Sequence, residues 1–249
     1  MLTLRICHLY PDLLNLYGDR GNVLTLSKRC EWRGIGSSIT PISIGDPFNS
    51  EDYDLVFIGG GQDYEQEILQ PDLLGQKAQE LKNYISGDGV VLAICGGYQL
   101  LGNYYKAQNG KEIRFLEALD LWTVAGETRM IGNIAFKSSL LPSEDSQNII
   151  VGFENHSGKT YLGPGVQPMG EVVKGYGNNG ETPFEGAVYQ NTFCTYSHGS
   201  LLPKNPALSD FLIDRALRKK YSDFSGLTLL DDQAEKLAHD TVLNRIVHS

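Results

Sequence analysis

The feature that most constrains the fold is a run of five aliphatic residues, Val90–Ile94, which ends at a cysteine followed by two glycines. An uninterrupted apolar run of this length predicts a strand that is buried on both faces, as in the centre of a parallel sheet. Gly96 and Gly97 permit a sharp turn, so Cys95 is expected where the strand passes into a helix. A side chain at such a turn stands at the carboxyl edge of the sheet beside free backbone N–H groups. Cys95 therefore has the setting of a nucleophile whose oxyanion those groups stabilise.

The alternative for Cys95 is a small buried hydrophobic residue, which is the usual state of a free cysteine. The two glycines after it favour a reactive thiol, and the partial positive charge at the start of a helix favours the thiolate. The four cysteines of the chain have no paired spacing. We therefore expect neither disulfides nor a cysteine zinc site, and no bound metal.

Short aliphatic strands alternate with amphipathic helices through the first half of the chain. The expected strands are Leu2–Leu9, Ile39–Ile44, Leu55–Ile58 and Val90–Ile94, and the expected helices are Gly21–Arg33 and Gln76–Ser86. This alternation predicts an α/β fold with a mostly parallel sheet and helices on both faces. Ligands bind such folds at the carboxyl ends of the strands, where both Gly59–Gly61 and Cys95 are expected.

The second half of the chain is expected to be β-rich, because glycine and proline are frequent from Gly110 to Phe193 and helical periodicity disappears. Its loosest region, Gly163–Gly180, predicts a loop or a hairpin tip. Two helices are expected near the end, Pro206–Lys220 and Asp231–Val247. The chain has no internal repeat or low-complexity tract, and we expect residues 1–249 to form a single domain.

Composition disfavours several classes of protein. A formal net charge of −9 makes a nucleic-acid partner unlikely to bind, so none is expected. No apolar run approaches the roughly 18 residues that a membrane-spanning helix needs. The first residues lack the pattern of a signal peptide, so we expect a cytoplasmic protein with reduced thiols.

A thiol nucleophile needs a base, usually a histidine that can be distant in the sequence. His198 follows the expected strand Phe193–Ser197, so it should stand at the functional edge of the sheet. His156 is the rival, and a structural loop histidine is the alternative for His198. The segment Ser157–Thr160 resembles the end of a phosphate-binding loop, but the upstream Gly152 is one residue too early, so we expect no nucleotide site there.

Three motifs together resemble the class I glutamine amidotransferase family. Ala93–Gln99, with the sequence Ala-Ile-Cys-Gly-Gly-Tyr-Gln, resembles its nucleophile motif Gly-x-Cys-x-Gly-x-Gln, with Ala93 in place of the first glycine. Gly59–Gly61 matches the oxyanion loop of the family, and Thr195–Gly199 resembles its histidine segment. The resemblance spans most of the chain and implies the flavodoxin-like fold of that family.

Three further segments resemble the glutaminase subunits of lipid II isoglutaminyl synthases. They are Leu14–Asn22, Val151–His156 and Gly175–Asn179. The resemblance implies that Cys95 attacks the side-chain amide of L-glutamine to form a glutamyl thioester, while His198 protonates the departing ammonia. The ammonia would pass to a Mur-ligase-like partner, MurT, which binds ATP and amidates the D-glutamate α-carboxyl of the lipid II stem peptide to D-isoglutamine. This chain would need no cofactor, and the complex would work at the inner face of the membrane on an anchored precursor.

The resemblance also assigns substrate-binding roles. Gln99 and Arg129 would hold the α-amino-acid part of glutamine, with Arg129 pairing with its carboxylate. Gly96 and either Gly60 or Gly61 would donate backbone N–H groups to the oxyanion.

One departure from the family pattern concerns the group that orients the histidine. Most class I domains carry a glutamate two residues after the catalytic histidine, whereas this chain has Ser200. Asp19 is the main candidate, because it follows the first strand and should lie at the carboxyl edge of the sheet. Its alternative is a helix N-terminal cap or a turn aspartate. Glu154 is a second candidate, and a Cys–His dyad without a third member is a further possibility.

Two other functions stay open at this point. The first is the amidase part of another amidotransferase, such as the cobyric acid synthase type, which carries a fused synthetase domain. The second is a non-catalytic regulatory subunit with the same fold, which the presence of Cys95 and His198 disfavours.

Overall fold

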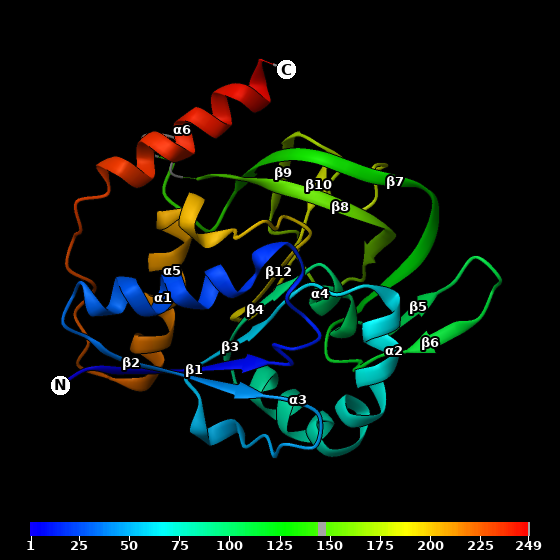
Figure 1. Ribbon diagram of the computed structural model, residues 1–249, viewed down its shortest axis with the longest axis horizontal. Coiled ribbons are helices and arrows are strands. Elements are labelled where there is room, and N and C mark those ends of the chain that lie inside the picture. The colour runs from blue at the N-terminus through cyan, green and yellow to red at the C-terminus, as the bar shows by residue number, and fades with distance from the viewer. Residues whose placement is uncertain (144–147, 249) are drawn as a thin grey trace.

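Two six-stranded sheets organise the computed structural model, which describes residues 1–143 and 148–248 (Figure 1). The first sheet contains β1 (Thr3–Leu9), β2 (Gly36–Ile42), β3 (Leu55–Ile58), β4 (Val90–Ile94), β11 (Ala187–Tyr189) and β12 (Thr192–Thr195). Its strand order is β11-β12-β4-β3-β1-β2, and every neighbouring pair is parallel except β11–β12. The predicted mostly parallel sheet is confirmed.

Helices cover both faces of this sheet, because successive residues of a strand point to opposite faces. These helices are α1 (Arg20–Glu31), α2 (Asp63–Asp72), α3 (Ala78–Ser86), α4 (Gly96–Leu100) and α5 (Pro206–Lys220), whereas α6 (Gln233–Val247) packs elsewhere. In β4, Val91 and Ala93 enter the core shared with α2 and α3, whereas Val90, Leu92 and Ile94 enter the core shared with α1 and α5. This two-sided burial explains why β4 is a continuous apolar run rather than an alternating one.

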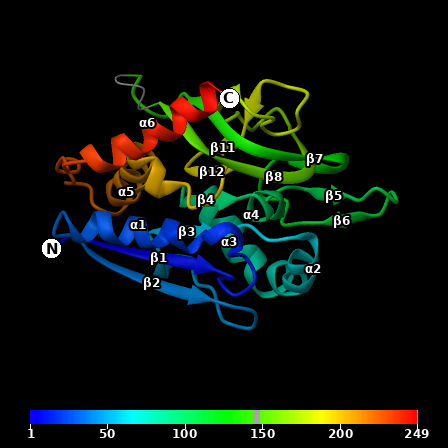
Figure 2. The same ribbon diagram turned by 45° about the horizontal axis from the view of Figure 1, so that its top comes forward.

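The second sheet confirms that the second half of the chain is β-rich. It contains β5 (Tyr104–Lys106), β6 (Glu112–Arg114), β7 (Leu121–Ser138), β8 (Ile149–Leu162), β9 (Gly170–Lys174) and β10 (Phe184–Glu185). Its main feature is the long antiparallel pair β7–β8, whose register shifts between Ala125 and Met130. Figure 2 shows this pair lying across the first sheet. Ile134 and Ile150 of the pair enter the core shared with α1 and α5.

The helix predicted at Gln76–Ser86 is the end of a longer helical unit, and the sequence prediction missed its first part. α2 begins at Asp63, where Gln62 and Glu65 form a capping box, and it continues through a π-helical turn at Leu73–Lys77 into α3. Pro71 lies inside α2. A proline and an irregular turn interrupt the 3.6-residue pattern on which the prediction depended.

The last helix, α6, lies apart from the first sheet and is fixed by a buried charge. Arg29 of α1 is fully buried and pairs with Asp210 of α5 at 2.6 Å and with Asp232, just before α6, at 2.7 Å. These two ion pairs join three helices that are distant in the sequence. Within the described residues, no helix is long and apolar enough to cross a membrane.

Candidate active site

Cys95 lies at the tight turn between β4 and α4, as predicted. Its φ of 49° and ψ of −106° are unusual for a residue with a side chain, and such strain is typical of functional turns. The turn packs closely on the glycine loop, Gly59–Gly61. A Cβ atom at Gly96 would lie 2.6 Å from Gly61 O, and one at Gly97 would lie 2.7 Å from Gly59 O. Both positions therefore require glycine because backbone approaches backbone there.

A cavity of about 230 Å³ opens beside this turn. Its lining includes Cys95, His198, Gln99, Arg129, Gly60 and Gly61, which come from four separate segments of the chain. The cavity is smaller than the roughly 300–1,000 Å³ of pockets for drug-sized ligands, which suits a ligand the size of an amino acid. The structure thus brings six predicted site residues together. Gly96 and Asp19 are absent from this lining and lie behind it.

His198 follows β12 and is anchored to β8 through its backbone. Its N–H donates to Phe153 O at 2.9 Å, and its carbonyl accepts from Phe153 N at 3.2 Å. Burial, with added repulsion from His156, Lys204 and Arg129, lowers the pKa of His198 to about 4. The imidazole is therefore neutral at pH 7 and can accept a proton.

The thiol of Cys95 is protonated in the unliganded protein. Burial and the nearby charge of Asp19 raise the pKa of Cys95 to about 12, against the opposing effects of Gly96 N–H and Arg129. The Gly96 N–H at the helix start acts in the predicted direction, but burial outweighs it. α4 has only five residues, so its dipole is small compared with the loss of solvation.

Arg129 and Gln99 occupy different parts of the cavity. Arg129 lies in the irregular stretch of β7 opposite β8, where its Nε donates to Asn155 Oδ1. Gln99 is fixed by its neighbours, because its Oε1 accepts from Gln66 Nε2 at 2.9 Å and its Nε2 donates to Tyr196 Oη at 3.0 Å. Arg129 is thus the exposed cation at the mouth, and Gln99 belongs to the wall.

Asp19, predicted to orient His198, lies against the glycine loop. Its carboxylate is fully buried, and its Oδ2 accepts from Gly60 N at 2.7 Å. Burial raises the pKa of Asp19 to about 7, although the Gly60 hydrogen bond and Lys204 oppose the shift. Asp19 stands at the N-cap position of α1, as its alternative role requires, but its side chain makes no capping hydrogen bond to that helix.

Glu154, the second candidate for orienting His198, holds a neighbouring loop. Its two oxygens accept from Tyr176 N at 2.7 Å and from Gly177 N at 3.0 Å. It also lies 3.9 Å from His156 Nε2, and the His156 ring stacks on Tyr196 with centroids 3.6 Å apart. His156 and Glu154 therefore support the wall of the cavity together.

The segment Ser157–Thr160 lies within β8, so it forms no phosphate-binding loop. This outcome agrees with the expectation from its spacing. Lys159 pairs with Glu181 at 2.6 Å. The lysine therefore has a partner on the protein surface.

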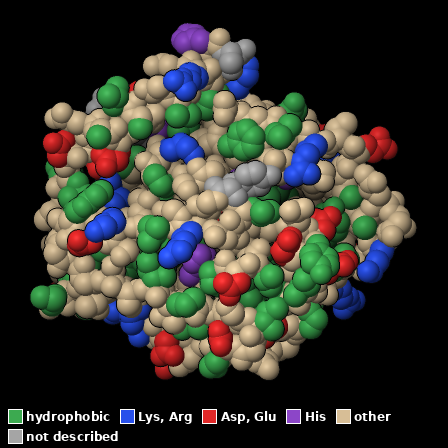
Figure 3. All heavy atoms as spheres, viewed as in Figure 1, with side chains coloured by type: hydrophobic (Ala, Val, Ile, Leu, Met, Phe, Trp, Pro, Cys, Tyr) green, Lys and Arg blue, Asp and Glu red, His purple; other side chains and the backbone are tan. Residues whose placement is uncertain are grey.

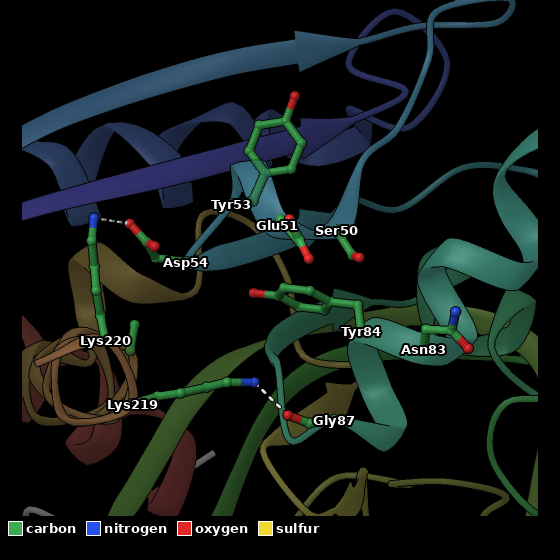
Figure 4. Close-up of a pocket in the computed structure, with 10 residues that line it drawn as sticks. Ser50, Glu51, Tyr53, Asp54, Asn83, Tyr84, Gly87, Lys219 and Lys220 are labelled. Carbon is green, nitrogen blue, oxygen red and sulfur yellow. Dashed lines mark hydrogen bonds and ion pairs between the residues drawn. The ribbon is translucent and has the colours of Figure 1, made fainter. Parts of the chain in front are cut away.

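A second cavity, of about 300 Å³, lies at the opposite edge of the first sheet and has a different character (Figure 4). Its lysines already have protein partners. Lys220 pairs with Asp54, before β3, at 2.7 Å, and Lys219 donates to the carbonyl of Gly87. No cysteine or histidine is among its lining residues. We interpret it as a structural junction between α5 and the amino ends of the strands.

Comparison with known proteins adds to this geometry. The sequence profile of the CobB/CobQ-like glutamine amidotransferase domain matches residues 5–206. The chain belongs to this glutamine amidotransferase family. The family resemblance predicted from the motifs around Cys95 and His198 is confirmed.

Relatives within the family match the chain to different extents. The Streptococcus pneumoniae protein named lipid II isoglutaminyl synthase (glutamine-hydrolyzing) subunit GatD is 43% identical over 230 residues, covering 92% of this chain and 86% of that protein. Its Staphylococcus aureus namesake is 38% identical, covering 98% and 97%. A Clostridium botulinum cobyric acid synthase is 29% identical, covering 68% of this chain but 35% of that protein. Members of the subunit type thus match along nearly their whole length.

Solved structures support the family fold. A Thermotoga maritima PurLQS structure has a TM-score of 0.58 at 15% identity, covering 87% of this chain and 98% of the other. A glutamine amidotransferase from the same organism has a TM-score of 0.53 at 15% identity, covering 99% of both. At such low identities these likenesses concern the fold alone, and they confirm the predicted class I glutamine amidotransferase architecture.

Sequence reasoning missed a buried carboxylate beneath the histidine segment. Glu185 is fully buried, and its Oε1 accepts from Thr195 Oγ1 at 2.6 Å and from Tyr196 N at 2.7 Å. Burial raises the pKa of Glu185. The residue holds the end of β12 just before His198. A single glutamate in a glycine-rich stretch carries no local pattern that would have identified it.

Proposed function

We propose that this chain is the glutaminase subunit of a lipid II isoglutaminyl synthase. It hydrolyses L-glutamine at Cys95 and delivers ammonia to a Mur-ligase-like partner, MurT, which amidates the D-glutamate α-carboxyl of the lipid II stem peptide. The observation that carries the proposal is one small cavity that joins the strained Cys95 to the neutral His198 and to Arg129. The full-length similarity to the two GatD subunits supports the choice of reaction.

The first step is proton transfer from the Cys95 thiol to the His198 imidazole. Both groups are neutral before substrate binds, because burial disfavours the thiolate and the imidazolium alike. The sulfur then attacks the side-chain amide carbon of glutamine, and the carbonyl oxygen becomes an oxyanion. His198 returns the proton to the departing nitrogen, so ammonia leaves and a glutamyl thioester stays on Cys95. Water, deprotonated by His198, hydrolyses the thioester to glutamate and regenerates the thiol.

The oxyanion receives two backbone N–H groups, one from Gly96 and one from Gly61. The sequence left Gly60 and Gly61 as alternatives, but Gly60 N–H already donates to Asp19 at 2.7 Å. Gly61 N lies against the Cys95 turn, since a Cβ atom at Gly96 would be 2.8 Å from it. Donors fixed before the reaction stabilise the developing charge without reorganisation.

Glutamine binds with its α-carboxylate on Arg129, whose guanidinium stands at the mouth of the cavity. Its side chain extends inward past Gln99 toward Cys95. No cofactor takes part in this chain's reaction, and ATP is bound by the partner.

The partner docks beside the cavity mouth, over α2. Asp63 and Tyr64 of α2 line the cavity, and the side chains of Tyr64 and Ile68 are 70% and 40% exposed. Figure 3 shows hydrophobic and acidic side chains gathered over this helix. An exposed apolar strip at the exit supports contact with a partner that shields ammonia from water. The complex then acts in the cytoplasm at the inner face of the membrane, where its anchored substrate lies.

The test uses the chain co-purified with its synthetase subunit. Cys95→Ala is expected to abolish glutamate release from glutamine, while added ammonium still supports amidation of lipid II. Cys30→Ala is the matched control, because Cys30 is buried in α1 away from the cavity. Glutamate release that survives in Cys95→Ala would reject the proposal. Wild-type complex that amidates with ammonium but never with glutamine would identify the chain as a non-catalytic subunit instead.

A further inference from the structure

Asp19 is a buried carboxylate that contacts the glycine loop. It follows a short 3-10 turn, Leu16–Gly18, and precedes α1. Its carboxylate is fully buried, and one oxygen accepts from Gly60 N at 2.7 Å. The other oxygen, Oδ1, has no hydrogen-bond partner among the residues that the structure describes. Burying a carboxylate with one oxygen unpaired costs free energy, so we expect its contact with Gly60 to serve a function.

The same segment holds both ends of Gly60. Asp19 takes its N–H, and Leu16 N donates to its carbonyl oxygen at 3.1 Å. The carbonyl of Gly60 and the N–H of Gly61 belong to one planar trans peptide, so they point in opposite directions. Because the carbonyl points to Leu16, the Gly61 N–H points away from Leu16.

The remaining neighbours show what lies in that direction. A Cβ atom at Gly60 would be 3.2 Å from Asp19 Oδ2 and 3.3 Å from Cys95 Cβ, so Gly60 sits between the carboxylate and the nucleophile. Gly61 N lies against Gly96, on the Cys95 turn. The Gly60–Gly61 peptide therefore turns its carbonyl to Leu16 and lays its nitrogen against the turn that carries Cys95.

We propose that Asp19 is a positioning residue that holds Gly60, so that the N–H of Gly61 is aimed at the oxyanion formed on Cys95. This inference rests on the proposed glutaminase reaction. It replaces the expected role of Asp19 as the group that orients His198. The hydrogen bond from Gly60 N to Asp19 positions the Gly60–Gly61 peptide. The negative charge of Asp19 separately raises the pKa of Cys95.

The kinetic test compares two substitutions. Asp19→Ala removes the acceptor, and we expect kcat for glutamine hydrolysis to fall by about 10²–10³ with little change in KM, as when one oxyanion donor is lost. Asp19→Asn keeps an oxygen that accepts from Gly60 N–H, and we expect it to recover kcat to within about tenfold of wild type. Asn15→Ala is the matched control. It removes a hydrogen bond of 2.8 Å to Arg20 N in the same turn.

The charge on Asp19 has its own readout, the rate at which iodoacetamide alkylates Cys95 near pH 8. The charged or titratable groups around this thiol include Asp19, Arg129, Glu185, Tyr196, His156 and His198. Since Asp19 raises the pKa of the thiol, Asp19→Asn should increase the thiolate fraction and speed alkylation about tenfold. Peptide mass spectrometry assigns the label to Cys95.

The outcomes separate the possible roles. Equal loss of kcat in Asp19→Ala and Asp19→Asn would overturn the proposal, because it would show that the charge, as in a histidine partner, is what catalysis needs. A rise in KM alone would also overturn it. If Asp19→Ala does not fold, Asp19→Asn decides the matter, and a loss beyond about tenfold rejects the positioning role. Wild-type complex without glutaminase activity would reject the proposed function, whereas the alkylation rate still reports on Asp19 and Cys95.

Discussion

Gly97→Ala tests whether contact between α4 and the glycine loop sets the width of the oxyanion site. A Cβ atom at Gly97 would lie 2.7 Å from Gly59 O and 2.7 Å from Ile58 Cγ2. Ordinary van der Waals contact begins near 3.4 Å, so α4 and the loop must separate by about 0.7 Å. The separation also stretches the 3.1 Å hydrogen bond from Gly97 N to Gly59 O. The two proposed oxyanion donors, Gly96 and Gly61, lie on opposite sides of this contact.

The expected effect is mainly on kcat. A misplacement of about 1 Å costs about 100-fold in rate, so a shift of about 0.7 Å should lower kcat by about 10–100-fold. KM should change less, because Arg129 lies on β7 and does not move with α4. Overpacking of this kind costs about 1–3 kcal/mol of stability, which leaves a protein of this size folded at 25 °C.

The assay measures glutamate release at several glutamine concentrations and the thermal unfolding midpoint of each variant. Gly75→Ala is the matched control, because a Cβ atom there would meet nothing within 4 Å. It should keep wild-type kinetics. Wild-type kcat in Gly97→Ala, or a change confined to KM, would refute the reasoning that this contact positions the oxyanion donors.

Two further predictions concern charged residues. Arg129→Ala should raise KM for glutamine by about tenfold or more with a smaller change in kcat, because it removes a ground-state contact. Steady-state kinetics measure both constants, and a loss of kcat without a rise in KM would contradict the role of Arg129 in binding the α-carboxylate. Arg29→Ala should lower the free energy of unfolding by about 2–4 kcal/mol in denaturant titrations, because Asp232 loses its ion-pair partner and Asp210 keeps only Arg33. The expected loss of unfolding free energy is smaller than for a fully buried ion pair, because the side chains of Asp210 and Asp232 are 26% and 17% exposed. Lys28→Ala, which removes an exposed ion pair, should change it by less than about 0.5 kcal/mol.

The strands and the nucleophile turn could be predicted because their signals are local. A strand buried on both faces must be apolar throughout, so the residue types of β4 predict its burial. A tight turn packed against another backbone requires glycine, so Gly96–Gly97 predict the turn. α2 escaped prediction because Pro71 and the π-helical turn after it break the helical pattern. Helix boundaries there depend on packing against the sheet rather than on the residues alone.

The members of the site could be predicted, but their interactions could not. Cys95, His198 and Arg129 were each placed by motif, and the cavity joins them. Asp19 was expected to face His198, yet it contacts Gly60, 41 residues away in the sequence. Residue type says that a buried carboxylate needs a donor, but it does not say which donor the fold brings near.

The sequence by itself determined the parallel α/β sheet, the strand that carries Cys95 and the family of the protein, because periodicity, glycine turns and motif order act within short segments. Tertiary structure alone decided the protonation of the site. The pKa of Cys95 rises to about 12 and that of His198 falls to about 4, because both are enclosed by segments from distant parts of the chain. It also decided that the N–H of Gly60 donates to Asp19. Desolvation and hydrogen-bond partners depend on residues that the fold brings together from distant segments, so no single segment determines these pKa values.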